Sequence, residues 1–144
     1  MNPSACPLCA DEAGEVLWRD DFCRVIWVAD ADYPGFCRVI LNQHVRDMTD
    51  LAPADRRRLM DVVFATEAVV RTILQPDKIN LASLGNVVPH LHWHVIPRFA
   101  DDRHFPDAVW ASPRRPLGCR PGPAEDVRPS CRALLRQRLG PSPE

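Results

Sequence analysis

Short stretches of alternating or continuously apolar residues recur along this chain and predict β-strands. They occupy residues 15–18, 23–28, 36–41, 79–84 and 90–98. Residues 15–18 and 23–28 are separated by Arg19-Asp20-Asp21, which predicts a hairpin. The pair Pro34-Gly35 indicates a turn before the third stretch.

One long helix is predicted between the third and fourth strands, at residues 53–74. Its apolar residues recur three or four positions apart, with charged residues between them. They are Leu59, Val62, Val63, Val69, Val70 and Ile73. Pro53 suits a first helical turn, and Pro76 ends the pattern. The order of strands, one long helix and strands predicts an α+β fold with an antiparallel sheet of about five strands.

Composition adds the expected domain organisation. The chain has 144 residues, of which 46% are hydrophobic, which suits one domain with a core. After Trp110 the chain becomes rich in proline and arginine. We therefore expect a folded domain over residues 1–112. A C-terminal extension with a short helix from about residue 130 to 139 is expected over residues 113–144.

Charge and hydropathy narrow the expected partners and location. A net charge of -1 gives no general electrostatic attraction to nucleic acid or acidic membranes. The first residues lack the basic and apolar segments of a secretory signal, and apolar runs such as residues 25–29 are too short to span a bilayer. We therefore expect a cytoplasmic protein, in which six cysteines are more typical of thiols or metal ligands than of disulfides.

The last predicted strand carries the most informative pattern in the chain. His90, His92 and His94 alternate with Leu91 and Trp93. Successive side chains of a strand point to opposite faces, so the histidines share one face and lie roughly 6.5 Å apart at their Cα atoms. Such a row of imidazoles suits metal binding or contact with an anionic group. A metal enzyme in which all three bind one ion is disfavoured, because their Cα atoms span about 13 Å.

The sequence His90-Leu91-His92-Trp93-His94-Val95-Ile96 resembles the signature of the histidine-triad (HIT) superfamily. The resemblance covers roughly residues 6–110, so residues 1–112 are expected to form a HIT domain. In particular, the chain resembles small bacterial HIT proteins of the diadenosine tetraphosphate hydrolase-like type. The resemblance implies a HIT-like fold, a homodimer, and a nucleotide hydrolase or transferase that cleaves at the α-phosphate. The implied substrates are dinucleoside polyphosphates or nucleoside phosphoramidates.

The resemblance also implies roles for individual residues. His92 is the expected nucleophile, which forms a nucleotidyl-histidine intermediate that water then cleaves. His94 is expected to hydrogen-bond the phosphoryl or bridging oxygens, and His90 to orient the strand. Asn86, beside Gly85, stands where many relatives carry glutamine after glycine; it is a candidate phosphate donor or a turn residue. Asp30 is a candidate ribose ligand or a solvated turn carboxylate.

A second motif, Cys6-Pro7-Leu8-Cys9, predicts half of a zinc site. A structural site needs four ligands, and His44 and His90 are the natural candidates for the other two. Some HIT relatives bind zinc in this way, with the first triad histidine as a ligand. A redox C-x-x-C motif and two unrelated buried thiols are the alternatives, but no thioredoxin-like βαβ unit is nearby. We expect a structural zinc and no organic cofactor.

Two further interpretations complete the expectations. A non-catalytic nucleotide-binding or sensing protein on the same scaffold is the alternative to an enzyme, because a fold does not guarantee activity. Among the remaining candidates, His104 lies in a polar turn and is expected at the surface. Trp27, Phe22 and Phe36 are expected in the core rather than against a nucleotide base.

Overall fold

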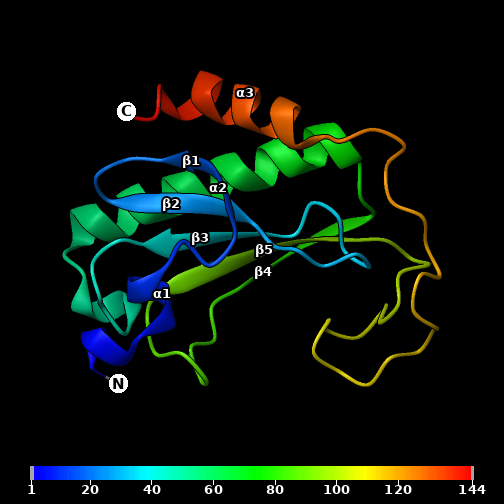
Figure 1. The fold of residues 1–144 in the computed structure, drawn as a ribbon, viewed down its shortest axis with the longest axis horizontal. Helices are drawn as coiled ribbons and strands as arrows, with labels where there is room; N and C mark the ends of the chain where they lie inside the picture. The colour runs from blue at the N-terminus through cyan, green and yellow to red at the C-terminus, as the bar shows by residue number, and fades with distance from the viewer. Residues whose placement is uncertain (1, 144) are drawn as a thin grey trace.

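The computed structural model describes residues 2–143 and contains one five-stranded antiparallel sheet (Figure 1). In spatial order the strands are β1 (Glu15–Arg19), β2 (Cys23–Trp27), β3 (Cys37–Leu41), β5 (His92–Arg98) and β4 (Lys78–Ala82). Every neighbouring pair is antiparallel. The predicted α+β fold class is therefore confirmed.

Helices cover one face of this sheet. The long helix is α2 (Pro53–Leu74), and α3 (Arg128–Leu139) lies beside it and near β1 (Figure 1). The remaining short elements are α1 (Pro7–Ala10) and two 3-10 turns, η1 (Pro3–Ala5) and η2 (Met48–Asp50). None of the helices within residues 2–143 is both long enough and apolar enough to cross a bilayer.

The bounds of α2 agree with the predicted helix, and its apolar stripe builds the main core. Pro53 occupies the first turn, where a missing N–H costs nothing, and Gln75 ends the helix in a left-handed conformation. Leu59 and Val63 are completely buried in the same core as Val95 of β5. Cys131 and Leu135 of α3 also join this core, so the C-terminal helix packs on the domain.

The opposite face of the sheet is covered by loops rather than by a long helix. At one end, Cys6 and Leu8 pack against Ile26 and Ile40. At the other end of β5, the segment that leads towards α3 returns over the sheet (Figure 1). Between these two covering segments the face of the sheet remains accessible. His92 and His94 of β5 lie on this accessible part of the face.

Strand β5 begins two residues later than the sequence predicts. The structure starts β5 at His92, so the expectation that His90 is a strand residue is wrong. The N–H of His90 donates to Val88 and that of Leu91 donates to Val45, both outside the β3–β5 ladder. The alternation of histidines is therefore a strand pattern only for His92 and His94.

Candidate active site

A cavity of about 390 Å³ opens above β3 and β5. In the sheet register, His92 is opposite Ile40 and His94 is opposite Arg38, so these four side chains share one face. The residues that line the cavity are Leu8, Arg38, Leu84, Gly85, Asn86, Val87, Val88, His92, His94 and Trp110. The structure therefore brings two of the three predicted catalytic histidines into one cavity.

His92 is held with one nitrogen free. Its Nδ1 lies 2.6 Å from the carbonyl oxygen of His90. A carbonyl only accepts, so Nδ1 carries the proton and donates, which leaves Nε2 with its lone pair. The side chain is 8% exposed, and burial lowers the pKa of His92 below its ordinary value. At neutral pH His92 therefore offers an unprotonated, oriented nitrogen.

His94 is held in the complementary way. Its Nδ1 accepts a hydrogen bond from Nε of Arg38 at 3.4 Å, so the proton of the neutral ring is on Nε2. Burial, followed by the proximity of His92 and Arg38, lowers the pKa of His94 to about 3. The two imidazole rings meet edge to face, with 4.9 Å between centroids. The cavity thus contains one imidazole acceptor and one imidazole donor, both uncharged.

Arg38 is a site residue that the sequence reasoning missed. It is half-buried on β3, and no carboxylate within residues 2–143 forms an ion pair with it. Burial lowers its pKa, but a guanidinium remains charged at neutral pH. A charged residue in the apolar run 36–41 was the available signal, since such a residue needs a partner. Among the described residues, Arg38 is the one charged side chain that lines the cavity, which suits it to bind an anion.

The predicted substrate residues separate into two groups. Gly85 and Asn86 line the cavity beside His92 and His94, as a phosphate-binding role requires. Asp30 lies elsewhere, in a separate cavity of about 570 Å³ that Glu125 and Arg128 also line. Its carboxylate accepts a hydrogen bond from the N–H of Asp32 at 3.0 Å, the arrangement of a turn. The structure therefore does not bring Asp30 to the histidines.

Trp110 is the second site residue that the sequence reasoning missed. Its indole lies 4.9 Å from the ring of His94, centroid to centroid, at 68°. The side chain is 50% exposed although it is large and apolar. It follows β5 by a dozen residues and lies just before the proline- and arginine-rich stretch, in a part of the chain for which the sequence predicted no strand or helix.

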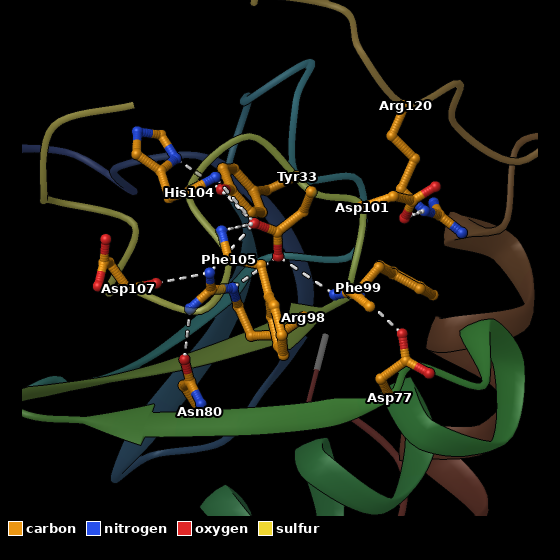
Figure 2. Close-up of polar contacts among 12 residues, drawn as sticks. Tyr33, Asp77, Asn80, Arg98, Phe99, Asp101, His104, Phe105, Asp107 and Arg120 are labelled. Atoms are coloured by element: carbon orange, nitrogen blue, oxygen red, sulfur yellow. Dashed lines mark hydrogen bonds and ion pairs between the residues drawn. The ribbon is translucent and has the colours of Figure 1, made fainter. Parts of the chain in front are cut away.

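The segment that carries Trp110 is organised by a buried ion pair (Figure 2). Arg98 shares a strand face with His94, and its guanidinium makes two hydrogen bonds to Asp102, at 2.8 and 3.1 Å. Both side chains are at most 2% exposed. Arg98 also donates to the carbonyl of Asp107 and to Asn80. The end of β5 therefore fixes the start of the loop that returns to the cavity.

The same network corrects the expectation for His104. This histidine is 7% exposed, and its Nδ1 lies 2.6 Å from the hydroxyl of Tyr33. The hydroxyl of Tyr33 in turn donates to Asp102 at 3.1 Å. His104 is therefore buried and not at the surface, because the loop folds back onto a residue that is distant in the sequence (Figure 2).

We expect Asp102→Asn to lower the free energy of unfolding by about 3 kcal/mol, since it leaves the buried Arg98 unpaired. Burial alone raises the pKa of Asp102, but hydrogen bonds from Arg98 and from three backbone N–H groups outweigh it and lower the pKa to about 2. The carboxylate therefore stabilises the fold above about pH 4 and loses this effect as the pH falls towards 2. Urea unfolding at pH 7 and at pH 3 measures both effects.

Asp101→Asn is the matched control for this experiment. Asp101 is the neighbouring carboxylate, 72% exposed, and it pairs with Arg120 at the surface. Exposed ion pairs contribute little, so the stability of this variant is expected to change little. Equal losses in the Asp101 and Asp102 variants would contradict the special role of the buried pair.

A second cluster lies next to the cavity and contains the predicted metal ligands. The Sγ atoms of Cys6 and Cys9 and the Nδ1 atoms of His44 and His90 all lie within 4.8 Å of one another. Sulfur–nitrogen distances are 3.4 Å for Cys6–His90, 3.3 Å for Cys9–His44 and 3.4 Å for Cys9–His90. A tetrahedral zinc separates such ligands by about 3.6 Å, so the donor set and its spacing fit zinc. Within residues 2–143, the triad histidines form no cluster of their own.

His90 connects this cluster to the cavity. Its ring is completely buried, and its Nε2–H donates to the carbonyl of Leu41 at 2.6 Å. That hydrogen bond leaves Nδ1 unprotonated and directed at the cysteines, as a metal ligand requires. The carbonyl of His90 meanwhile accepts from Nδ1 of His92. One residue therefore serves the cluster with its side chain and the candidate nucleophile with its backbone.

Comparison with known proteins places these features in context. The family model of the HIT domain matches residues 11–101. An AP-4-A phosphorylase from Mycobacterium tuberculosis is 26% identical over 105 residues, which are 69% of this chain and 54% of that protein. The chain thus spans about half the length of the curated relatives that it matches.

Solved structures show the same fold. A histidine triad protein from Bradyrhizobium japonicum is 26% identical, with a TM-score of 0.69 over 89% of this chain and 92% of that one. Another from Marinobacter aquaeolei is 27% identical, with a TM-score of 0.68 over 92% of each chain. A zinc-bound histidine triad family protein from Mycobacterium smegmatis is 24% identical, with a TM-score of 0.65 over 94% of this chain and 96% of that one.

Proposed function

Because this chain belongs to the HIT domain family, we propose that it is a nucleotide hydrolase or transferase that acts at the α-phosphate through a nucleotidyl-histidine intermediate on His92. The observation that carries the proposal is the hydrogen bond from Nδ1 of His92 to the His90 carbonyl. It leaves an unprotonated Nε2 in a cavity that also contains the guanidinium of Arg38.

The reaction follows from the two imidazoles. Nε2 of His92 attacks the α-phosphorus, and the bond from phosphorus to the leaving atom breaks. Because Nδ1 keeps its proton, the nucleotidyl-imidazole is cationic, and the His90 carbonyl stabilises it. A water then attacks phosphorus and the Nε2–phosphorus bond breaks. One hydrogen of that water ends on the released nucleoside monophosphate and the other on the leaving group.

The other lining residues stabilise the charge that moves during transfer. The terminal guanidinium nitrogens of Arg38 are available to bind the non-bridging phosphate oxygens, because within residues 2–143 its side chain donates only from Nε, to His94. The Nε2–H of His94 is available to donate to the departing atom, and Asn86 to donate to a phosphate oxygen. Positioned donors of this kind lower the barrier of phosphoryl transfer.

We further propose that Cys6, Cys9, His44 and His90 hold a structural zinc. Support comes from the spacing of the four donor atoms and from the hydrogen bond that fixes the His90 ring. The related Mycobacterium smegmatis structure is a zinc-bound one. When bound, the ion cross-links the N-terminal segment to the loop before β5, and four protein ligands leave no position for a reacting water. The homodimer, the cytoplasmic location and the boundary near residue 112 stay predictions.

Turnover of a small substrate panel tests the proposed reaction. Adenosine phosphoramidate and diadenosine tetraphosphate are incubated with the protein, with and without inorganic phosphate. Adenosine monophosphate as the product indicates that water accepts the nucleotidyl group. Adenosine diphosphate that forms only when phosphate is present indicates a phosphorylase, which is the activity in the name of the Mycobacterium tuberculosis relative. Mass spectrometry of rapidly quenched protein is expected to detect one added adenylyl group. No turnover of any substrate by folded protein would contradict an enzymatic role and favour a nucleotide-binding protein.

A further inference from the structure

Exposed apolar side chains gather at the mouth of the histidine cavity. The large hydrophobic residues that are exposed within residues 2–143 are Phe64, Leu84, Val87, Trp110 and Leu117. Three of these five, Leu84, Val87 and Trp110, line this one cavity, with exposed fractions of 53%, 87% and 50%. Apolar surface that is concentrated at a reactive site indicates contact with an apolar part of a ligand.

The charge in the cavity limits what the rest of that ligand carries. Within residues 2–143, Arg38 is the one lining side chain that carries a permanent charge. One guanidinium matches one phosphoryl charge. A polyphosphate chain carries several negative charges and is better served by several cations or a divalent ion. The cavity therefore suits a single phosphoryl group bonded to an uncharged leaving group.

Trp110 stands on the side of the cavity where that leaving group departs. Its ring contacts His94, whose Nε2–H is available to donate to the departing atom in the proposed reaction. The ion pair of Arg98 with Asp102 fixes the loop that carries Trp110, as Figure 2 shows for the start of that loop. A group bonded to the departing atom therefore meets the indole face or edge before it meets solvent.

We propose that Trp110, flanked by Leu84 and Val87, is a specificity-determining residue that selects substrates with an aromatic leaving group, namely aryl or arylalkyl amidates or esters of a nucleoside monophosphate. The proposal rests on the proposed function, because the departing side of the cavity is defined by His92 and His94. Trp110 contributes a flat apolar surface. Stacking on this surface lowers the binding free energy of an aromatic group, whereas a charged phosphate chain gains nothing from it.

Binding measured in a His92→Asn background tests the proposal without turnover. The two ligands are adenosine phosphoramidates that carry either a benzyl or a methyl group on nitrogen. The benzyl ligand is expected to bind about tenfold more tightly, the scale of an aromatic contact together with its buried area. Adding Trp110→Ala is expected to reduce this ratio to less than about threefold, and Trp110→Phe to restore most of it.

Leu117→Ala is the matched control, since Leu117 is an equally apolar and more exposed residue of the same segment that does not line the cavity. The control is expected to keep the benzyl preference. The proposal is overturned if the parent shows no preference, if neither ligand binds, or if Trp110→Ala keeps the full ratio. If Trp110→Ala keeps the benzyl ratio but no longer prefers ligands that contain adenosine over ligands that contain only the ribose, the indole instead contacts the nucleobase. Failure of wild-type turnover overturns the proposed reaction alone, because these ratios do not depend on it.

Discussion

Replacing His92 by asparagine is expected to reduce turnover of every substrate by at least about a thousandfold, because it removes the nucleophile of a covalent mechanism. The asparagine amide retains an N–H that can donate to the carbonyl of His90, as Nδ1 of His92 does at 2.6 Å. It has no nitrogen lone pair that attacks phosphorus. The cavity is therefore expected to keep its shape and lose its chemistry, so nucleotide binding survives in the variant.

His104→Asn is the control for the loss of a buried histidine. His104 is 7% exposed, against 8% for His92, and it does not line the cavity. We expect this variant to lose no more than a few-fold in kcat/KM. Substrate turnover and nucleotide binding are measured on both variants after thermal unfolding has shown that they are folded. Turnover that survives in His92→Asn would exclude the nucleotidyl-histidine intermediate.

The elements that the sequence predicted well are those that local periodicity determines. The stripe from Leu59 to Ile73 predicted that α2 is a helix, because apolar residues with a period near 3.6 share one face only in a helix. Pro53 and Pro76 predicted where that helix begins and ends. The alternation around His92 and His94 placed both side chains on one strand face for the same reason. The strand after Pro76 was also predicted, although its end at Ala82 comes two residues earlier than expected.

The residues that were missed depend on contacts between distant parts of the chain. Arg38 became a site residue only through the register that sets it opposite His94, 56 positions further along. Trp110 reaches the same ring because Arg98 and Asp102 direct the loop that carries it. No period in the sequence encodes either pairing. His104 was predicted at the surface for the same reason, since its polar neighbours gave no indication of the contact with Tyr33.

His90 illustrates how a correct chemical prediction accompanied a wrong structural one. The alternating pattern extended the strand back to residue 90, whereas the N–H of His90 bonds to Val88 and β5 begins at His92. The spacing of Cys6 and Cys9 nevertheless led to His44 and His90 as partners, and the structure gathers these four residues. Cys6 and Cys9 lie outside residues 11–101, the range of the family match, whereas His44 and His90 lie within it.

Cys6→Ser is expected to remove zinc from a protein that otherwise contains about one zinc per chain. Cys6 is completely buried against His90, and a serine hydroxyl is a poor replacement for a thiolate ligand. We expect the free energy of unfolding to fall by about 3 kcal/mol and Tm by roughly 10 °C, since the metal stabilises only the folded state. Turnover is expected to fall as well, because the His90 carbonyl then holds Nδ1 of His92 less firmly. Elemental analysis, thermal unfolding and kcat measure the three effects.

Cys119→Ser separates the loss of a ligand from the loss of a thiol. Cys119 lies outside the cluster, with its thiol near the carbonyl of Asp101, and its replacement is expected to leave zinc content and Tm unchanged. Treating wild-type protein with a chelator is expected to reproduce the lower Tm of Cys6→Ser, because both remove the same cross-link. A disulfide between Cys6 and Cys9 in the isolated protein would favour a redox motif. Full zinc content in Cys6→Ser would overturn the cysteine site and return the metal to the triad histidines.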